Sequence, residues 1–510
     1  MMELPQQLYR AEQVRALDRT AIETFNTPGI DLMERAGAAT FEAMRQRWPQ
    51  ARRIAVFCGA GNNGGDGFII ARLASEQGLA VQVCLLADAG RLKGDAKLAY
   101  QKLQNTAVTI VTSITEFDEK ADVIVDALLG TGLSGEVKDQ WRLVIDWINE
   151  QRNRSACKVI AVDIPSGLHA DTGSVLGAAI EADLTVTFIG VKQGLLTAQG
   201  PDHCGELTFD DLQVDSRVYE QVPASANLLS QALLGQIFRP RKRASHKGSY
   251  GHVLVVGGNY GMAGAARMAG EAALRTGAGM VSVACRPEHV AAVVGARPEL
   301  MCHGIESVVQ FRRLMNEATV IAIGPGLGQD AWAQQLLGAV LESRIPLVLD
   351  ADALNLLAKE PAVRDNWVLT PHPAEAGRLL SMTTYDIQQD RFAAASALQQ
   401  RYGGVAVLKG NGTVVSDCNG ALSVCPVGNP GMASGGMGDV LTGIIAACIA
   451  QSRMNTSEQN QTLLSVLSAA SKVAVYVHGR AADLAAESSG ERGMLASDLF
   501  PYIRQLANAS

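Results

Sequence analysis

The segment GNPGMASGGMGDVLTGIIAACIA, residues 428–450, decides the fold of the second half of the chain. It is a glycine-rich loop that leads into an apolar helix, which we expect to begin near Asp439. Glycines let several backbone N–H groups converge on one anion, and the amino terminus of a helix adds partial positive charge. The pattern therefore predicts a loop for phosphoryl transfer. The competing interpretation makes Asp439 only a helix cap.

Apolar strands alternate with alanine-rich helical stretches around this loop. The expected strands are residues 252–256, 280–285, 319–324, 346–351 and 405–410. Strict alternation of strand and helix is typical of a parallel sheet with helices on its faces. The second half of the chain is therefore predicted to be one α/β domain.

The first half of the chain repeats this rhythm. A strand at 53–58, the loop GAGNNGGDG at 59–67, a helical pattern at 68–77 and a strand at 80–86 predict a βαβ unit. Further strands are expected at 123–128, 159–164 and 184–189. The alternation of strands and helices stops around 210–230, before the basic stretch RPRKRASHKGSYG at 239–251. We therefore predict two domains, residues 1–222 and 223–510.

Composition excludes several classes of protein. A chain of 510 residues with 47% apolar and 19% charged residues is expected to fold as more than one globular domain. A net charge of −7 argues against nucleic acid or an anionic membrane as partner. Nine cysteines without a CxxC pair fit neither a disulfide framework nor a zinc site. The start of the chain does not resemble a signal peptide, and the apolar run at 440–450 is too short to span a bilayer, so we expect a cytoplasmic protein.

The loop at 59–67 has two interpretations. Gly59, Gly61 and Gly64 match the dinucleotide-binding fingerprint, with Asp88 roughly where a ribose-binding acid would lie, but this signal alone is weak. The loop also carries side-chain oxygens on Asn62, Asn63 and Asp66, which indicates a polar binding site. Asn and Asp also stabilise turns through their own backbone, which is the competing explanation.

Two further acids, Asp126 and Asp163, follow expected strands. The carboxyl ends of parallel strands share one edge of the sheet, so Asn63, Asp126, Asp163 and Ser166 are expected to converge there. Oxygen ligands without cysteine or histidine suit a hard cation such as an alkali metal or magnesium. A helix cap or a turn is the alternative for either aspartate.

Three other patterns in the second half indicate ligand contacts. Lys409 ends a strand and opens KGNGT at 409–413, which is either a nucleotide contact or a tight hairpin turn. The glycine run GPGLG at 324–328 allows a close approach of the backbone to a ligand. His372 lies between prolines in TPHPAE at 370–375, and a buried structural histidine is the alternative to a substrate contact.

The ordered motifs NNGGDG (62–67), VDALLGTG (125–132) and VDIPSG (162–167) resemble the YjeF-type amino-terminal domain of the bifunctional NAD(P)H-hydrate repair enzymes. The loop at 428–439 resembles the GxGD signature of ribokinase-like enzymes, where an aspartate deprotonates the attacking hydroxyl. The resemblance implies an α/β protein of two domains. These are an amino-terminal Rossmann-like three-layer α/β/α domain and a carboxy-terminal ribokinase-like α/β/α domain.

The resemblance also implies site residues. Asp439 and Asp163 would be catalytic, and potassium would bind Asn63, Asp126 and Ser166. The epimerase substrate would contact Asn62, Asn63, Gly64, Gly65, Asp66, Gly130, Thr131, Gly132, Leu133, Ser134, Gly135, Glu136 and Asp163. The dehydratase substrate would contact Ala263, Ala265, Gly326, His372 and Asp439, and the nucleotide would contact Lys409, Gly410, Asn411, Gly412, Thr413 and Gly438. Lys192 is a further candidate for a phosphate contact, and a solvated lysine at a strand end is its alternative. Glu375 occupies the place of a magnesium-linked glutamate of related kinases.

The implied activity is repair of damaged coenzyme. One domain would interconvert the R and S forms of hydrated NADH and NADPH, and the other would dehydrate the S form at the expense of ADP or ATP. Bacterial members of the family typically use ADP and eukaryotic members ATP, and the sequence leaves both open. Potassium and magnesium ions and a homo-oligomer are expected. The alternatives are a ribokinase-like small-molecule kinase with an accessory first domain, and a first domain that only binds.

Overall fold

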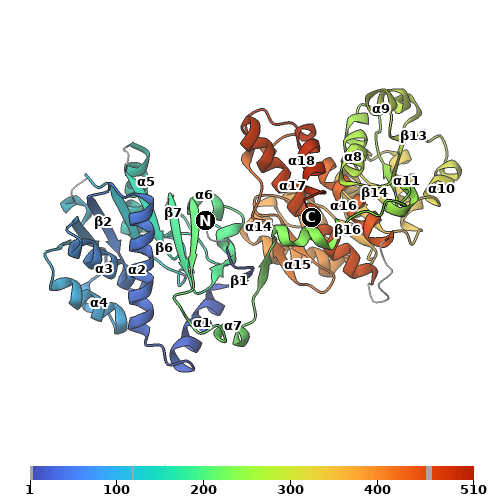
Figure 1. Ribbon diagram of the computed structural model, residues 1–510. Helices are drawn as coiled ribbons and strands as arrows, with labels where there is room; N and C mark the ends of the chain where they lie inside the picture. The colour runs from blue at the N-terminus through green and yellow to red at the C-terminus, as the bar shows by residue number, and fades with distance from the viewer. Residues whose placement is uncertain (1–3, 118–119, 155–156, 455–461, 510) are drawn as a thin grey trace. The chain divides into compact units, whose positions relative to one another are not determined.

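The computed structural model describes residues 4–117, 120–154, 157–454 and 462–509. Two compact units make up the chain, Met1–Asn227 and Leu228–Ser510 (Figure 1). All nine cysteines are free, and most are buried. No helix of the described residues is long and apolar enough to cross a membrane.

The first unit contains a seven-stranded parallel sheet with the order β4-β3-β2-β5-β6-β7-β9. Its strands are β2 (Arg53–Cys58), β3 (Ala80–Leu85), β4 (Thr109–Val111), β5 (Val123–Ala127), β6 (Lys158–Val162), β7 (Leu184–Phe188) and β9 (Glu206–Asp210). Short strands β1 (Gln7–Tyr9), β8 (Val191–Lys192) and β10 (Ala226–Leu228) lie apart from this sheet, with β1 parallel to β8 and antiparallel to β10. The predicted strands are confirmed, and the order reverses between β2 and β5.

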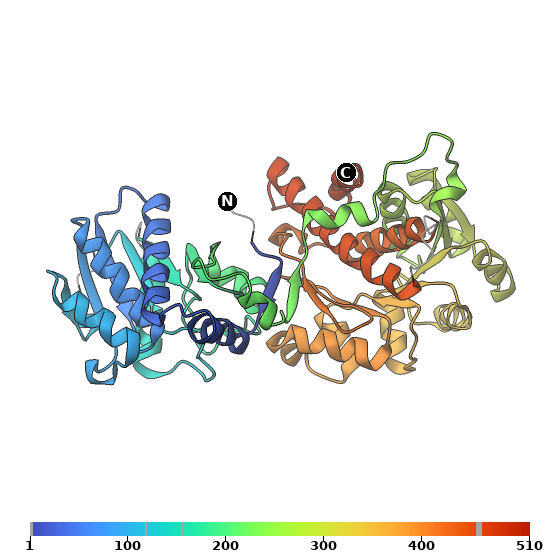
Figure 2. The ribbon, with the colours of Figure 1, turned by 60° about the horizontal axis from the view of Figure 1, so that its bottom comes forward.

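Helices cover both faces of this sheet. The helices of the unit are α1 (Ala11–Glu23), α2 (Gly29–Arg47), α3 (Asn62–Glu76), α4 (Gly94–Gln104), α5 (Asp139–Arg154), α6 (Gly200–Cys204) and α7 (Val218–Gln221). Ile54 and Val56 of β2 pack with α2, α3 and α4, which lie side by side in Figure 2, whereas Ala55 and Phe57 pack with α5. This alternation gives the predicted three-layer α/β/α arrangement.

The glycine-rich segment at 59–67 corrects one expectation. Its residues from Asn62 onward are the first turns of α3 rather than a loop, so the helix begins six residues earlier than predicted. Glycine is a poor helix former, but here it is required for packing. A Cβ on Gly64 would lie 2.0 Å from the Gly59 carbonyl oxygen, and one on Gly67 would lie 2.7 Å from both Ala127 Cβ and Cys58 Sγ. Close packing of α3 on the sheet therefore outweighs local propensity.

In the second unit the strand order is β13-β12-β11-β14-β15-β16-β17-β18-β19, parallel up to β17 and antiparallel beyond it. The strands are β11 (His252–Val256), β12 (Met280–Cys285), β13 (Met301–Gly304), β14 (Val320–Ile323), β15 (Leu347–Leu349), β16 (Trp367–Leu369), β17 (Val405–Leu408), β18 (Val414–Ser416) and β19 (Leu422–Val424). The order reverses between β11 and β14. Every strand predicted for this half is confirmed.

One large core lies between this sheet and four of the unit's helices. These four are α8 (Ala263–Thr276), α16 (Met437–Met454), α17 (Leu463–Ser489) and α18 (Phe500–Leu506). The remaining helices are α9 (Val290–Ala296), α10 (Val308–Met315), α11 (Ala331–Leu341), α12 (Ala351–Lys359), α13 (Pro373–Leu380), α14 (Thr384–Gln389) and α15 (Arg391–Tyr402). Val253 and Val255 face that core, and Leu254 and Val256 are equally buried on the opposite face. The second unit is therefore also a three-layer α/β/α domain.

Candidate active sites

The candidate site of the first unit is a cavity of about 590 Å³ at the carboxyl ends of β2, β5, β6 and β7. It lies where the strand order reverses, which is where open α/β sheets bind ligands. The predicted substrate residues that line it are Asn62, Asn63, Asp66, Gly130, Thr131, Gly132, Leu133 and Asp163. The fold thus brings three separate motifs to one cavity.

The other five predicted substrate residues do not line the cavity that the described residues form. They are Gly64, Gly65, Ser134, Gly135 and Glu136. Gly64 contacts the Gly59 backbone instead, and the exposed Glu136 carboxylate lies 3.4 Å from Lys138 Nζ. Asp88, the candidate ribose-binding acid, accepts a hydrogen bond from Gly90 N–H at the start of a short 3₁₀ turn. Contacts of these residues with a substrate stay predictions.

Asp163 has a strained backbone and a buried cationic partner. Its φ of 66° lies in the left-handed region, which residues other than glycine rarely adopt. Its carboxylate accepts hydrogen bonds from Phe188 N–H (3.2 Å) and the Thr187 hydroxyl (3.3 Å) and pairs with Lys192. The Lys192 side chain is fully buried, so its interpretation as a solvated lysine is wrong. No helix follows Asp163 either, which excludes the helix-cap interpretation.

Two more acids beside Asp163 have perturbed pKa values. Burial raises the pKa of Asp66 well above its usual range, and the negative charges of Asp163 and Asp18 raise it further. Burial also raises the pKa of Asp18 to about 6. Such clusters of perturbed acids are typical of sites that move protons. Sequence reasoning missed Asp18, because an acid on an amphipathic helix such as α1 normally faces solvent.

Asn63, Asp126 and Ser166 converge beside Leu129, as predicted. Ser166 donates its N–H and its hydroxyl to the Asp126 carboxylate (2.7 and 2.6 Å), and the Asn63 amide donates to the Leu129 carbonyl (3.3 Å). Burial raises the pKa of Asp126 to about 6, and its hydrogen-bond donors in the described chain are neutral. A buried carboxylate among neutral oxygens fits one monovalent cation. Asp126 also accepts the Leu128 N–H, so the turn interpretation holds as well.

The glycine-rich loop of the second unit leads into α16. The helix begins at Met437, two residues earlier than expected, so Asp439 lies inside the first turn rather than at the cap. The start of the loop is fixed by Asp483, which accepts hydrogen bonds from Gly428 N–H (3.0 Å) and the Asn429 amide (2.9 Å). Burial, aided by the negative charge of Asp350, raises the pKa of Asp439 to about 7. The carboxyl is therefore suited to accept a proton near neutral pH.

A buried ion pair lies beside this loop. Lys409 Nζ is 2.6 Å from Asp350 Oδ1 and 3.9 Å from Glu375 Oε2. Burial alone would lower the pKa of Lys409, but the two carboxylates outweigh it and the pKa is raised. A Cβ on Gly438 would lie 3.2 Å from Lys409 Nζ, so the first turn of α16 lies directly against the ammonium group. This brings together Lys409 and Gly438, two of the predicted nucleotide contacts.

Asp350 is a site residue that sequence reasoning missed. Burial raises its pKa, but Lys409 and the hydroxyls of Thr442 and Thr370 outweigh burial, so the pKa is lowered and the group is charged. Both hydroxyls donate to it over 2.9 Å. The sequence did contain a signal for Asp350, because this acid directly follows β15, at the same edge of the sheet as the other site residues.

Residues 409–413 form the turn between β17 and β18, which pair antiparallel with Leu408 opposite Val414. The hairpin interpretation is therefore confirmed. The buried Arg391 guanidinium donates to the Leu408 and Lys409 carbonyls (3.1 Å each) and so holds the start of the turn in place. Contacts of Gly410, Asn411, Gly412 and Thr413 with a nucleotide stay predictions.

His372 is half exposed, so its interpretation as a buried structural histidine is wrong. Its Nδ1 accepts the Ala374 N–H (3.1 Å), and Glu375 accepts the His372 N–H (2.8 Å), which together cap α13. Burial lowers the pKa of His372, which favours the neutral ring with its proton on Nε2. His372 Nε2 lies 3.4 Å from Glu375 Oε1, so this N–H faces that carboxylate.

The loops that follow β11 and β14 meet where the strand order of the second unit reverses. Asn259 N–H donates to the Gly326 carbonyl (2.7 Å), and a Cβ on Gly326 would lie 3.2 Å from Ala265 Cβ. Ala263 opens α8 at the same place. These predicted substrate residues are therefore brought together in a crevice position typical of ligand sites.

Fold and sites together define a two-domain α/β enzyme whose second unit is ribokinase-like. A family model described as NAD(P)H-hydrate dehydratase matches residues 253–505, and one described as YjeF-related protein N-terminus matches residues 29–194. A crystal structure of a hypothetical protein from Streptococcus mutans is 30% identical with a TM-score of 0.50, and the match covers 55% of this chain and 99% of that one.

Curated relatives match over almost the whole chain. A bifunctional NAD(P)H-hydrate repair enzyme from Coxiella burnetii is 50% identical over 98% of this chain and 99% of its own length. Enzymes of the same name from Escherichia coli (44% identical, 99% and 95% covered) and Leishmania braziliensis (39% identical, 94% and 90% covered) also match. The chain belongs to the family of bifunctional NAD(P)H-hydrate repair enzymes, which confirms the resemblance seen in its motifs.

Proposed function

We propose that residues 1–222 interconvert the R and S forms of hydrated NADH and NADPH, and that residues 223–510 dehydrate the S form with ADP or ATP. The observation that carries the proposal is Asp439, a carboxyl with a pKa of about 7 in the first turn of the helix that follows the glycine-rich loop. Asp439 lies in the electrostatic reach of Lys409, whose charge neutralises phosphates entering the loop.

The dehydration would run in two steps. The ring hydroxyl oxygen bonds to the terminal phosphorus of the nucleotide, Asp439 takes the hydroxyl proton, and AMP or ADP leaves. The C–O bond of the phosphorylated ring then breaks with help from the electron pair of the ring nitrogen. Phosphate departs, and loss of a ring proton restores NADH or NADPH. Phosphorylation is useful because hydroxide is a poor leaving group.

Each remaining group of the second unit has a positioning task in this scheme. Ala263, Ala265, Gly326 and His372 would border the hydrated nicotinamide. Lys409 to Thr413 and Gly438 would hold the nucleotide. The Asp350 carboxylate would keep Lys409 charged and in place, because its oxygen lies 2.6 Å from Nζ.

In the first unit Asp163 would face the reacting ring of the hydrated coenzyme, and Lys192, Asp66 and Asp18 surround it. Their clustering in one cavity supports this assignment. A site for one epimer in the second unit rejects the other, so an epimerase in the same chain recovers coenzyme that would otherwise be lost.

Two cations belong to the proposal. The oxygens of Asn63, Asp126 and Ser166 would bind potassium, since the buried Asp126 is surrounded by neutral donors. The described residues contain no cluster of three or more acid, histidine or cysteine ligands. Magnesium would therefore bind together with the phosphates of the nucleotide, as it often does. The predicted homo-oligomer and cytoplasmic location stay predictions.

The test incubates the purified chain with both epimers of hydrated NADH and with ADP or ATP, and follows the absorbance of reduced nicotinamide. Return of absorbance from both epimers, together with release of phosphate, is expected. The faster of the two nucleotides identifies the donor. Accumulation of a stable phosphorylated product would instead favour a small-molecule kinase with a non-catalytic first domain.

A further inference from the structure

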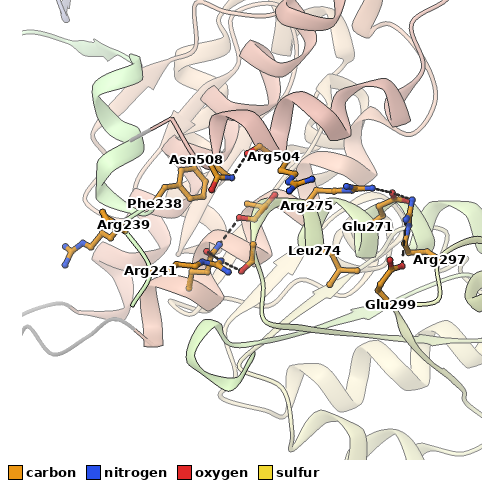
Figure 3. A pocket seen from close by; sticks show the side chains of 15 residues that line it. Phe238, Arg239, Arg241, Glu271, Leu274, Arg275, Arg297, Glu299, Arg504 and Asn508 are labelled. Carbon is orange, nitrogen blue, oxygen red and sulfur yellow. Dashed lines mark hydrogen bonds and ion pairs between the residues drawn. The ribbon is translucent and has the colours of Figure 1, made fainter. Parts of the chain in front are cut away.

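A second cavity of the second unit lies far from the chemistry just described. It has a volume of about 550 Å³ and is lined by the segment before β11 and by residues of α8, α16 and α18 (Figure 3). Its loop residues precede the strands: Gly277 comes before β12, and Arg297 and Glu299 come before β13. The site residues Asp350 and Lys409 follow β15 and β17, at the opposite edge of the parallel sheet. The cavity is therefore separate from the proposed dehydratase site.

The lining of this cavity is strongly basic. Five arginines stand against two glutamates, a net formal charge of +3, in a chain whose total charge is −7. The arginines are Arg239, Arg241, Arg275, Arg297 and Arg504. Such a concentration of guanidinium groups in a hollow attracts anions and raises their local concentration.

The glutamates leave much of this charge uncompensated. Glu271 is only 3% exposed and alone pairs with three arginines, at 3.1 Å to Arg267, at 3.6 Å to Arg275, and in close contact with Arg297. Glu299 is mostly exposed and reaches Arg297 only at 3.8 Å. Figure 3 shows the Arg275 and Arg297 side chains on either side of Glu271. One buried carboxylate thus fixes three guanidinium groups while neutralising one charge.

One guanidinium group of the cluster is left for a ligand. Arg504 lines the cavity and is exposed to solvent, and among the described residues its side chain has no ion pair or hydrogen bond. Guanidinium groups match the paired oxygens of phosphates.

We propose that this cavity, which we name the arginine pocket, binds a small anion with two or more linked phosphate groups. A single phosphate would balance less than the net charge of the lining, whereas a di- or triphosphate matches it. The volume suits a ligand of that size. A nucleotide and an inorganic polyphosphate share this chemistry.

The test titrates inorganic tripolyphosphate into the full chain in a calorimeter. The double variant Arg275→Gln with Arg504→Gln is expected to bind it at least about tenfold more weakly, or ~1.4 kcal/mol, than the unchanged chain. Arg313→Gln is the matched control, since Arg313 is exposed on α10 outside the pocket. Dehydration without added polyphosphate should be the same in all three proteins.

Further measurements locate the ligand and its source. Hydrogen exchange should slow in α18 on binding, and only when the pocket is intact. ADP should show one site more in the unchanged chain than in the double variant if a nucleotide is the source, and equal numbers if inorganic polyphosphate is. Should the double variant fold poorly, Arg504→Gln alone carries the test, because its loss breaks no ion pair. Equal tripolyphosphate affinity with and without these arginines overturns the proposal.

Discussion

At the scale of single residues, Asp439 should set the pH dependence of dehydration. Its folded pKa is raised to about 7, so below that pH the carboxyl is protonated and cannot accept the hydroxyl proton. We expect kcat/KM for dehydration to fall roughly tenfold per pH unit below about pH 7 and to level off above it. Asp439→Asn should lower kcat by about 10² to 10⁴ and remove this limb, with epimerisation unaffected. Full dehydration by that variant would exclude Asp439 as the base.

Replacing Asp350 gives a second test of the role of the Asp439 carboxyl. Its negative charge raises the pKa of Asp439, and it also balances Lys409, whose positive charge lowers it. Asp350→Asn removes the first effect and unmasks the second, so both changes favour the ionised form of Asp439. The acid limb of the dehydration profile should therefore move to lower pH. Thr370→Val removes a hydroxyl that bonds to Asp350 and to the Leu349 carbonyl but leaves the charge of Asp350 in place, so it should move the limb less. A shift to higher pH would contradict the assigned charges.

In the first unit the pair of Lys192 and Asp163 should matter for stability as well as chemistry. Lys192 is fully buried, and removing one partner of a buried pair leaves an uncompensated charge, which costs about 3–5 kcal/mol. Lys192→Met should lower the free energy of unfolding by that order, measured with denaturant, and abolish epimerisation. The double change Lys192→Met with Asp163→Asn should recover part of the stability but no activity. Recovery of activity would mean that Asp163 does not act on the substrate.

At the scale of elements, α3 depends on its glycines. A Cβ on Gly64 would lie 2.0 Å from the Gly59 carbonyl oxygen, whereas one on Gly61 meets no atom within 4 Å. Gly64→Ala should therefore destabilise the first unit by ~2–3 kcal/mol through overpacking and weaken substrate binding. Gly61→Ala is the matched control and should stay within about 0.5 kcal/mol of the unchanged chain. Chemical denaturation measures both, and equal stabilities would show that α3 can shift away from the sheet.

The same helix shows which parts of the fold the sequence can predict. Buried strands such as 53–58 and 252–256 are continuous apolar runs, so their positions were predictable to within a residue or two. The start of α3 was not, because NNGGDG has low helix propensity and only contact with β2 and β5 makes it helical. Asp126 and Asp163 were found because an acid directly follows a strand. Asp18 was not, since only the tertiary fold turns that face of α1 toward the cavity.

At the scale of the whole molecule, the two active sites should work independently. Each lies within its own compact unit, with its own sheet and core. Asp163→Asn should still dehydrate the S epimer but leave the R epimer, and Asp439→Asn should epimerise without restoring NADH. Neither variant alone should recover coenzyme from the R form.

A mixture of these two variants should therefore recover NADH from both epimers, because the epimer released by one molecule can diffuse to the other. The measurement follows reduced-nicotinamide absorbance from pure R epimer, with a sample lacking protein to subtract spontaneous epimerisation. With dilute protein, recovery by the mixture should slow as the concentration falls, in proportion to the limiting variant. If the mixture fails where the unchanged chain succeeds, the substrate must pass between the sites of one chain, and independence of the two units would be wrong.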